Sequence, residues 1–175
     1  MDLAPYIRNM PDFPKPGIQF KDITTLLLHP PAFREVIRRL EERYRSNPPD
    51  AVAAIDARGF VFGAALCLSL DLPLVLVRKK GKLPADTVSA TYDLEYGSET
   101  IEMHRDALRA GQRVLIIDDL LATGGTVAAA ADLARQLGAS VQEAAFVVEL
   151  PPLKGRQRLA SMDIPVFSLV TFMVE

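Results

Sequence analysis

The chain contains short, continuously apolar runs separated by segments of helical length, and this order constrains its fold more than any other feature. Ala51–Ile55 and Leu74–Val77 show no alternation of apolar and polar residues, which is typical of strands buried on both faces of a sheet. Between them, Phe60–Leu70 is long enough for a helix. Strand, helix and strand in this order predict a right-handed parallel crossover.

The same order recurs further along the chain. Val114–Ile117 and Val141–Val148 are strand-like, and the alanine-rich segment Thr126–Leu137 between them is followed by Gly138, a residue type that ends many helices. Two crossovers predict an α/β fold with a central, mainly parallel sheet flanked by helices. Because 175 residues fit one compact domain with its own core, we expect a single domain over residues 1–175.

Residues 81–105, between the two crossovers, have a different character. They include Pro84, turn residues around Gly97, and alternation from Thr100 to Met103, which is typical of a hairpin. We therefore expect a flap inserted at about residues 81–105.

Charge and composition exclude several classes of protein. A formal net charge of -2 argues against a nucleic-acid-binding protein that relies on bulk positive potential. Cys67 is the only cysteine, so neither an internal disulfide nor a cysteine metal cage can form. The sequence shows no apolar run long enough to cross a bilayer and no signal-like N-terminus. We expect a cytoplasmic protein without nucleic-acid or membrane partners.

Two adjacent carboxylates, Asp118 and Asp119, follow the strand-like run Val114–Ile117. The carboxyl ends of parallel strands form the ligand-binding edge of open α/β sheets. Carboxylates at that edge can accept hydrogen bonds from vicinal hydroxyl groups such as those of a ribose. Taken alone, the pair is more often the solvated start of a loop.

The loop that follows the carboxylates contains Thr123, Gly124, Gly125 and Thr126, just before the alanine-rich helix. Glycines let the backbone approach a ligand closely, and free N–H groups at a helix start bind phosphate. A glycine pair alone is more often a simple turn, but together with the carboxylates it predicts a seat for a ribose phosphate. The common nucleotide motifs are absent from this loop, so we expect it to hold one phosphate and not a triphosphate.

Residues 114–126 resemble the phosphoribosyl pyrophosphate (PRPP) signature of the type I phosphoribosyltransferases, in which two acidic residues precede a threonine- and glycine-rich loop. Further motifs are similar to those of family members that act on adenine. In chain order these are Phe13–Ile18 with Phe20–Thr24, Ala57–Phe60, Arg78–Pro84 and Tyr92–Gly97. The resemblance runs from about residue 11 to the end, thinning after Leu150, and the shared order of the motifs argues against an accidental match. It implies the type I fold with an N-terminal hood of about residues 1–30.

The resemblance also implies residue roles. Asp118 and Asp119 hold the ribose hydroxyls, while the 5-phosphate is wrapped by Ala122, Thr123, Gly124, Gly125 and Thr126. The pyrophosphate group is held by Ala57, Arg58, Arg78, Lys79 and Lys82. The basic residues of this set also lie at the predicted ligand edge, although a run such as 78–82 is more commonly a solvated turn. In this family the bond Asp56–Ala57 is often a non-proline cis peptide bond.

Base recognition and proton transfer are implied in the same way. The adenine contacts fall on Gln19, Phe20, Lys21 and Leu150. Glu95 lies near N7 of the base as the general acid or base, with Tyr96 reaching toward pyrophosphate and Arg58 completing the catalytic set. Mg²⁺ is the implied cofactor, held mainly through the substrate because the sequence offers no dedicated protein cage.

The reaction implied is transfer of the 5-phosphoribosyl group from PRPP to adenine, giving AMP and pyrophosphate in purine salvage. The implied partners are adenine, PRPP, AMP and a second copy of the chain in a homodimer. One alternative is a phosphoribosyltransferase for xanthine, guanine or hypoxanthine, against which the block Leu94–Gly97 favours adenine. Another is a non-catalytic regulator that senses PRPP, which the retained basic and flap motifs disfavour.

Overall fold

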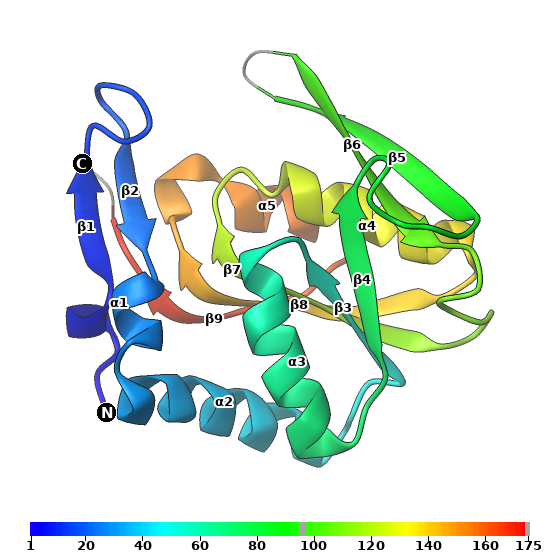
Figure 1. Ribbon diagram of the computed structural model, residues 1–175, viewed down its shortest axis with the longest axis horizontal. Coiled ribbons are helices and arrows are strands. Elements are labelled where there is room, and N and C mark those ends of the chain that lie inside the picture. The colour runs from blue at the N-terminus through cyan, green and yellow to red at the C-terminus, as the bar shows by residue number, and fades with distance from the viewer. Residues whose placement is uncertain (95–96, 174–175) are drawn as a thin grey trace.

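The computed structural model describes residues 1–94 and 97–173, and within them the chain forms a seven-stranded sheet with helices on both faces (Figure 1). The strand order is β5-β6-β4-β3-β7-β8-β9, beside a separate two-stranded sheet of β1 and β2. The helical elements are η1 (Ala4–Tyr6), α1 (Thr24–Leu27), α2 (Pro30–Arg45), α3 (Arg58–Leu70), α4 (Gly125–Gln136), η2 (Pro151–Leu153) and α5 (Gly155–Ala160). The strands are β1 (Arg8–Pro11), β2 (Gln19–Asp22), β3 (Ala51–Ile55), β4 (Leu74–Lys79), β5 (Thr87–Asp93), β6 (Ser98–His104), β7 (Arg113–Leu121), β8 (Ser140–Glu149) and β9 (Val166–Thr171).

The sheet is mainly parallel, as predicted. The pairs β3–β4, β3–β7, β7–β8 and β8–β9 are parallel, whereas β4–β6 and β5–β6 are antiparallel. The order of apolar runs therefore predicted the fold class correctly.

Among the described residues, no helix is long and apolar enough to span a bilayer.

Alternate residues of the central strands face opposite layers of helices. In β3, Ala51, Ala53 and Ile55 pack into a cluster with α4 and α5, whereas Val52 and Ala54 pack with α2 and α3. All five side chains are buried. A strand covered on both faces has no polar side, which is why the apolar run Ala51–Ile55 predicted the bounds of β3.

Strand β7 is longer than the predicted Val114–Ile117 because its two neighbours differ in length. The pairing of β3 with β7 ends at Ala54 and Ile117, but β8 pairs with β7 as far as Leu121. Asp118 and Asp119 therefore lie within β7 and not after it. They belong to the part of the strand that extends beyond its pairing with β3.

Two antiparallel hairpins flank the parallel part of the sheet. In the N-terminal hairpin of β1 and β2, Met10 is opposite Phe20. The hairpin of β5 and β6, which projects beyond the sheet at the top of Figure 1, places Tyr92 opposite Glu99. It is the hairpin expected in residues 81–105, and the pairing of β6 with β4 makes it a continuation of the main sheet.

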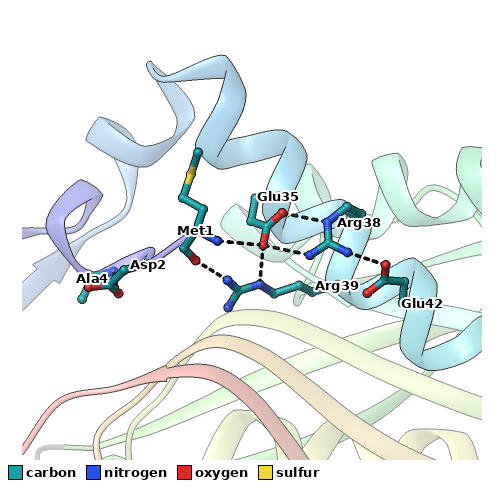
Figure 2. Close-up of polar contacts among 7 residues, drawn as sticks. All are labelled: Met1, Asp2, Ala4, Glu35, Arg38, Arg39 and Glu42. Atoms are coloured by element: carbon teal, nitrogen blue, oxygen red, sulfur yellow. Dashed lines mark hydrogen bonds and ion pairs between the residues drawn. The ribbon is translucent and has the colours of Figure 1, made fainter.

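The charged face of α2 holds the N-terminus of the chain. Arg38 and Arg39 donate to Glu35, at 2.7 Å from Arg38 Nε and 2.8 Å from Arg39 Nε. The ammonium group of Met1 lies 3.5 Å from the same carboxylate, and Arg39 also donates to the carbonyl of Met1 (Figure 2). The hydrogen bonds from Arg38 and then Arg39 hold the pKa of Glu35 well below its ordinary value. This network fixes the chain end beside Leu3, which is buried.

Candidate functional site

A cavity of about 240 Å³ opens at the carboxyl edge of the sheet, where strands from the parallel part meet the β5–β6 hairpin. It is lined by Ile55, Asp56, Ala57, Arg58, Val77, Lys79, Tyr92, Glu99, Ile101, Asp118, Asp119 and Thr126. A second cavity of about 180 Å³ is lined by the loop between β7 and α4 and shares Asp118 and Thr126 with the first. The fold thus brings residues from five strands and two helices, far apart in the sequence, to one edge.

The two carboxylates of β7 have different surroundings. Asp119 is buried and accepts a hydrogen bond from Arg58 Nε at 2.5 Å. Asp118 accepts one from the backbone N–H of Asp119 at 2.8 Å. Burial, followed by the negative charge of Asp119, raises the pKa of Asp118 well above its ordinary value. The start of α3 lies close to β7 because Gly59 has no side chain. A Cβ at this position would lie only 2.8 Å from the carbonyl oxygen of Ile117.

The loop between β7 and α4 surrounds the second cavity. Gly124 has a φ of 77°, a left-handed conformation that favours glycine, and α4 begins at the next residue. The first N–H groups of a helix lack partners within the helix. Helix α5 packs on the loop from outside, so closely that a Cβ on Gly155 would lie 2.3 Å from the carbonyl oxygen of Ala122. A small cavity bordered by free N–H groups at a helix start is suited to a phosphate group.

The cations of β4 are paired with carboxylates at the first cavity. Arg78 Nε donates to Asp56 Oδ2 at 2.9 Å, and Lys79 Nζ lies 2.5 Å from Glu99 Oε1. The peptide bond Asp56–Ala57 is cis, as the family resemblance implied. Positive charge is thus present beside the carboxylates of β7, but in this state it is balanced by acidic side chains.

Tyr92 and Glu99, to which the sequence analysis gave no role, also line the first cavity. The Tyr92 hydroxyl donates to Glu99 Oε2 at 2.7 Å and accepts from Thr126 Oγ1 at 3.0 Å. The sequence could have shown that Tyr92 and Glu99 are opposite each other, because a turn at Gly97 sets the register of the hairpin. It could not have shown that the pair lies over the cavity, because this depends on the pairing of β6 with β4, for which the local sequence has no signal.

Several residues with predicted roles lie outside the lining of both cavities. They are Gln19, Phe20, Lys21, Arg78, Lys82 and Leu150. Arg78 reaches the lining through its hydrogen bond to Asp56. Phe20 approaches it through Arg58, whose guanidinium carbon lies 5.8 Å from the centre of the Phe20 ring. Lys21 Nζ donates to Asn9 Oδ1 at 3.0 Å, so its ammonium group is engaged within the β1–β2 hairpin. Lys82 is exposed, and Leu150 is buried in the cluster beside α2 and α3.

Glu95 and Tyr96, the residues expected at the tip of the β5–β6 hairpin, lie outside the described residues. Their predicted roles at N7 of the base and at pyrophosphate stay predictions. The last pair of β5 and β6 before these residues is Asp93 and Ser98.

Comparisons with known proteins agree with this geometry. Residues 22–171 match the family described as phosphoribosyl transferase domain. The adenine phosphoribosyltransferase of Chloroflexus aurantiacus is 58% identical over 171 residues, which cover 98% of each chain. The crystal structure of adenine phosphoribosyltransferase from Thermoanaerobacter pseudethanolicus has a TM-score of 0.93 at 48% identity, covering 97% of this chain and 98% of that one. The Saccharomyces cerevisiae enzyme, complexed with an imino-altritol bisphosphate and adenine, has a TM-score of 0.89 at 41% identity, with 96% of each chain covered.

Proposed function

The chain belongs to the adenine phosphoribosyltransferase family, and from this premise we propose that it transfers the 5-phosphoribosyl group of PRPP to adenine. The products are AMP and pyrophosphate, as in purine salvage. The observation that carries this proposal is the junction of two cavities at Asp118 and Thr126. One cavity is suited to a phosphate, and the other combines carboxylates for ribose hydroxyls with cations for pyrophosphate.

The residue roles follow from this placement. We assign the ribose hydroxyls to Asp118 and Asp119 and the 5-phosphate to the loop from Ala122 to Thr126. Arg58 and Lys79, which line the first cavity, bind pyrophosphate together with the backbone at Ala57. Arg78 and Lys82 join them when the flap closes over the substrate.

The adenine site is proposed at the N-terminal hairpin. Its β2 strand carries Gln19, Phe20 and Lys21, and the contact between Phe20 and Arg58 puts one face of this strand next to the first cavity. Phe20 and Leu150 cover the faces of the base, while backbone groups of residues 19–21 read its edge. Glu95 manages the proton at N7, and Tyr96 reaches toward pyrophosphate.

The reaction replaces pyrophosphate at the anomeric carbon of the ribose with N9 of adenine. Positive charge develops on the ribose as the C–O bond breaks, so the carboxylates of Asp118 and Asp119 stabilise it while they hold the hydroxyls. Arg58 and Lys79 stabilise the negative charge that accumulates on the leaving group. Positioning both reactants at one edge of the sheet supplies the remaining acceleration.

Mg²⁺ is the proposed cofactor. Within residues 1–94 and 97–173, no group of three or more His, Cys, Asp or Glu side chains is placed to hold a metal ion. The carboxylates of Asp118 and Asp119 in the cavity are hard oxygen ligands of the type that Mg²⁺ prefers. We propose that Mg²⁺ binds mainly through PRPP oxygens beside these two residues, where it neutralises charge on the leaving group.

We propose that the enzyme is a homodimer. Helix α3 and strand β4, which lie side by side in Figure 1, expose Val61, Leu68, Leu74 and Leu76, with Leu68 88% exposed. Large apolar side chains exposed on two neighbouring elements favour an interaction surface there. A second copy of the chain is the occupant that the family suggests.

The remaining proposals concern organisation and location. We propose that residues 1–175 work as one domain, with the hood at about residues 1–30 and the flap at about residues 81–105. PRPP carries several negative charges and does not cross lipid bilayers, so an enzyme that consumes it works where it is made. We therefore place the protein in the cytoplasm.

Turnover with adenine, PRPP and MgCl₂ tests the proposed function. We expect stoichiometric AMP and pyrophosphate, and competition with xanthine, guanine and hypoxanthine should leave adenine as the preferred base. Turnover of one of the other bases in preference to adenine would change the substrate assignment. Binding of PRPP without turnover of any purine base would instead indicate a regulator.

A further inference from the structure

Three side-chain contacts cross the first cavity from its cationic side to the phosphate loop. Lys79 Nζ lies 2.5 Å from Glu99 Oε1. The other oxygen of Glu99 accepts from the Tyr92 hydroxyl at 2.7 Å, and that hydroxyl accepts from Thr126 Oγ1 at 3.0 Å. Glu99 is the only one of these four residues that carries negative charge at neutral pH.

The sheet explains why this carboxylate lies over the cavity. On one face of the β5–β6 hairpin, Val88 is opposite Met103 and Ala90 is opposite Ile101. These pairs pack into the apolar cluster with α4. The next pair on the same face is Tyr92 and Glu99, so the regular alternation of β6 carries Glu99 beyond the core and onto the cavity.

Glu99 pairs with a cation that substrate phosphates would use, and through the Tyr92 hydroxyl it is linked to a hydroxyl of the phosphate loop. Lys79 is the cation assigned to pyrophosphate, and Thr126 belongs to the loop assigned to the 5-phosphate. Burial raises the pKa of Tyr92 to about 12; the hydrogen bond from Thr126 opposes this shift, whereas the hydrogen bond to Glu99 and its charge add to it. The hydroxyl therefore keeps its proton for Glu99. The ring of Tyr92 also lies close to the loop: a Cβ added to Gly125 would be 3.2 Å from a carbon of the Tyr92 ring.

We propose that Glu99 is a positioning residue that takes the place of the substrate anion in the free enzyme. It holds Lys79 and Tyr92 across the empty cavity, gives them up when the phosphates of PRPP enter, and recaptures Lys79 as pyrophosphate leaves. The carboxylate thereby weakens the binding of pyrophosphate and speeds its release. The proposal rests on the proposed function, since it takes Lys79 as a pyrophosphate ligand.

The sign of one affinity change tests this role. In Glu99→Gln the competing charge is removed with little change of shape, so calorimetry should show pyrophosphate with MgCl₂ binding about two- to fivefold more tightly, the range of a partly exposed ion pair. KM for PRPP should fall, and pyrophosphate release measured by stopped flow should slow by a similar factor. A purely structural role in supporting the flap would give the opposite sign, with weaker binding and a higher KM.

Two further single variants and a second background sharpen the experiment. Glu99→Asp keeps the charge and should bind pyrophosphate within about twofold of the wild type, whereas Thr100→Val removes only the neighbouring contact between Thr91 and Thr100 on the same hairpin and should change nothing. In a Lys79→Met background, Glu99→Gln should lose most of its effect, because coupled residues give non-additive changes.

Unchanged or weaker pyrophosphate binding in Glu99→Gln, with a melting temperature like that of the wild type, would overturn the proposal. So would an equal gain in affinity in the Lys79→Met background. Failure of the proposed function would look different, because the wild type would then bind pyrophosphate without turning over adenine.

Discussion

At Asp118, a carboxylate with a proposed catalytic role lies where the fold disfavours its charge. Burial, and then the charge of Asp119, raises its pKa, so the folded state binds a proton more tightly than the unfolded chain. The folded state therefore loses stability as the pH rises from the pKa of about 3.9 in the unfolded chain toward the raised pKa in the folded state. At neutral pH, above the unfolded pKa, the raised pKa of Asp118 therefore lowers the stability of the fold.

Asp118→Asn should consequently raise the melting temperature at pH 7 by about 2–4 °C while lowering turnover by about 100-fold through misplacement of the ribose. Scanning calorimetry and steady-state assays measure the two effects. At about pH 3, below the unfolded pKa, the stabilisation should vanish because Asp118 is then protonated in both states. An asparagine variant less stable than the wild type at pH 7 would contradict this account.

At the scale of elements, the short helix α5 supports the phosphate loop and is itself held by an ion pair between Arg156, which is half exposed, and the buried carboxylate of Glu149. Arg156, the second residue of α5, donates to both oxygens of Glu149, with Nε 2.8 Å from Oε1, and to the carbonyl of Val166 at 2.8 Å. Glu149 is 2% exposed. The hydrogen bonds from Arg156 hold its pKa below the ordinary value even though burial opposes this.

Arg156→Ala should destabilise the fold by about 3 kcal/mol, because it leaves the buried carboxylate of Glu149 without its cation. As α5 loosens, Gly155 should no longer support the loop, and AMP should bind more weakly. Urea unfolding and AMP titration measure these effects. Gln157→Ala, an exposed change on the same helix, is the matched control and should stay within about 0.5 kcal/mol of the wild type. A similar loss in both variants would exclude the ion pair as its cause.

At the scale of the whole molecule, the exposed apolar side chains on α3 and β4 predict the assembly. Placing a charge at the most exposed of these positions with Leu68→Lys should convert the dimer to a monomer, because an unpaired charge at an apolar interface is costly. Light scattering coupled to size exclusion measures the mass. Leu28→Lys, at a residue that is 83% exposed beside α1, is the control and should remain dimeric. A wild-type chain that runs as a monomer at micromolar concentration would contradict the proposed homodimer.

The sequence by itself determined the parallel core and much of the proposed site. Ala51–Ile55 predicted β3 because residues buried on both faces must all be apolar, which is a local property. The carboxylates Asp118 and Asp119 and the glycine loop could be recognised because they are contiguous, and the cis bond at Asp56–Ala57 followed from a resemblance carried by neighbouring residues. Features formed by adjacent residues can be recognised from the sequence because they do not depend on which distant segments come together.

Only the tertiary structure decided which distant residues meet. The extension of β7 to Leu121 depends on its pairing with β8, and the hairpin joins the sheet through the pairing of β6 with β4. That second pairing brings Glu99 to Lys79, 20 positions away in the chain, and the packing of the hairpin on α4 brings Tyr92 to Thr126. The physical reason is that hydrogen bonds between strands are made by the backbone, which every residue carries, so the side chains give little local sign of which strand will be the partner.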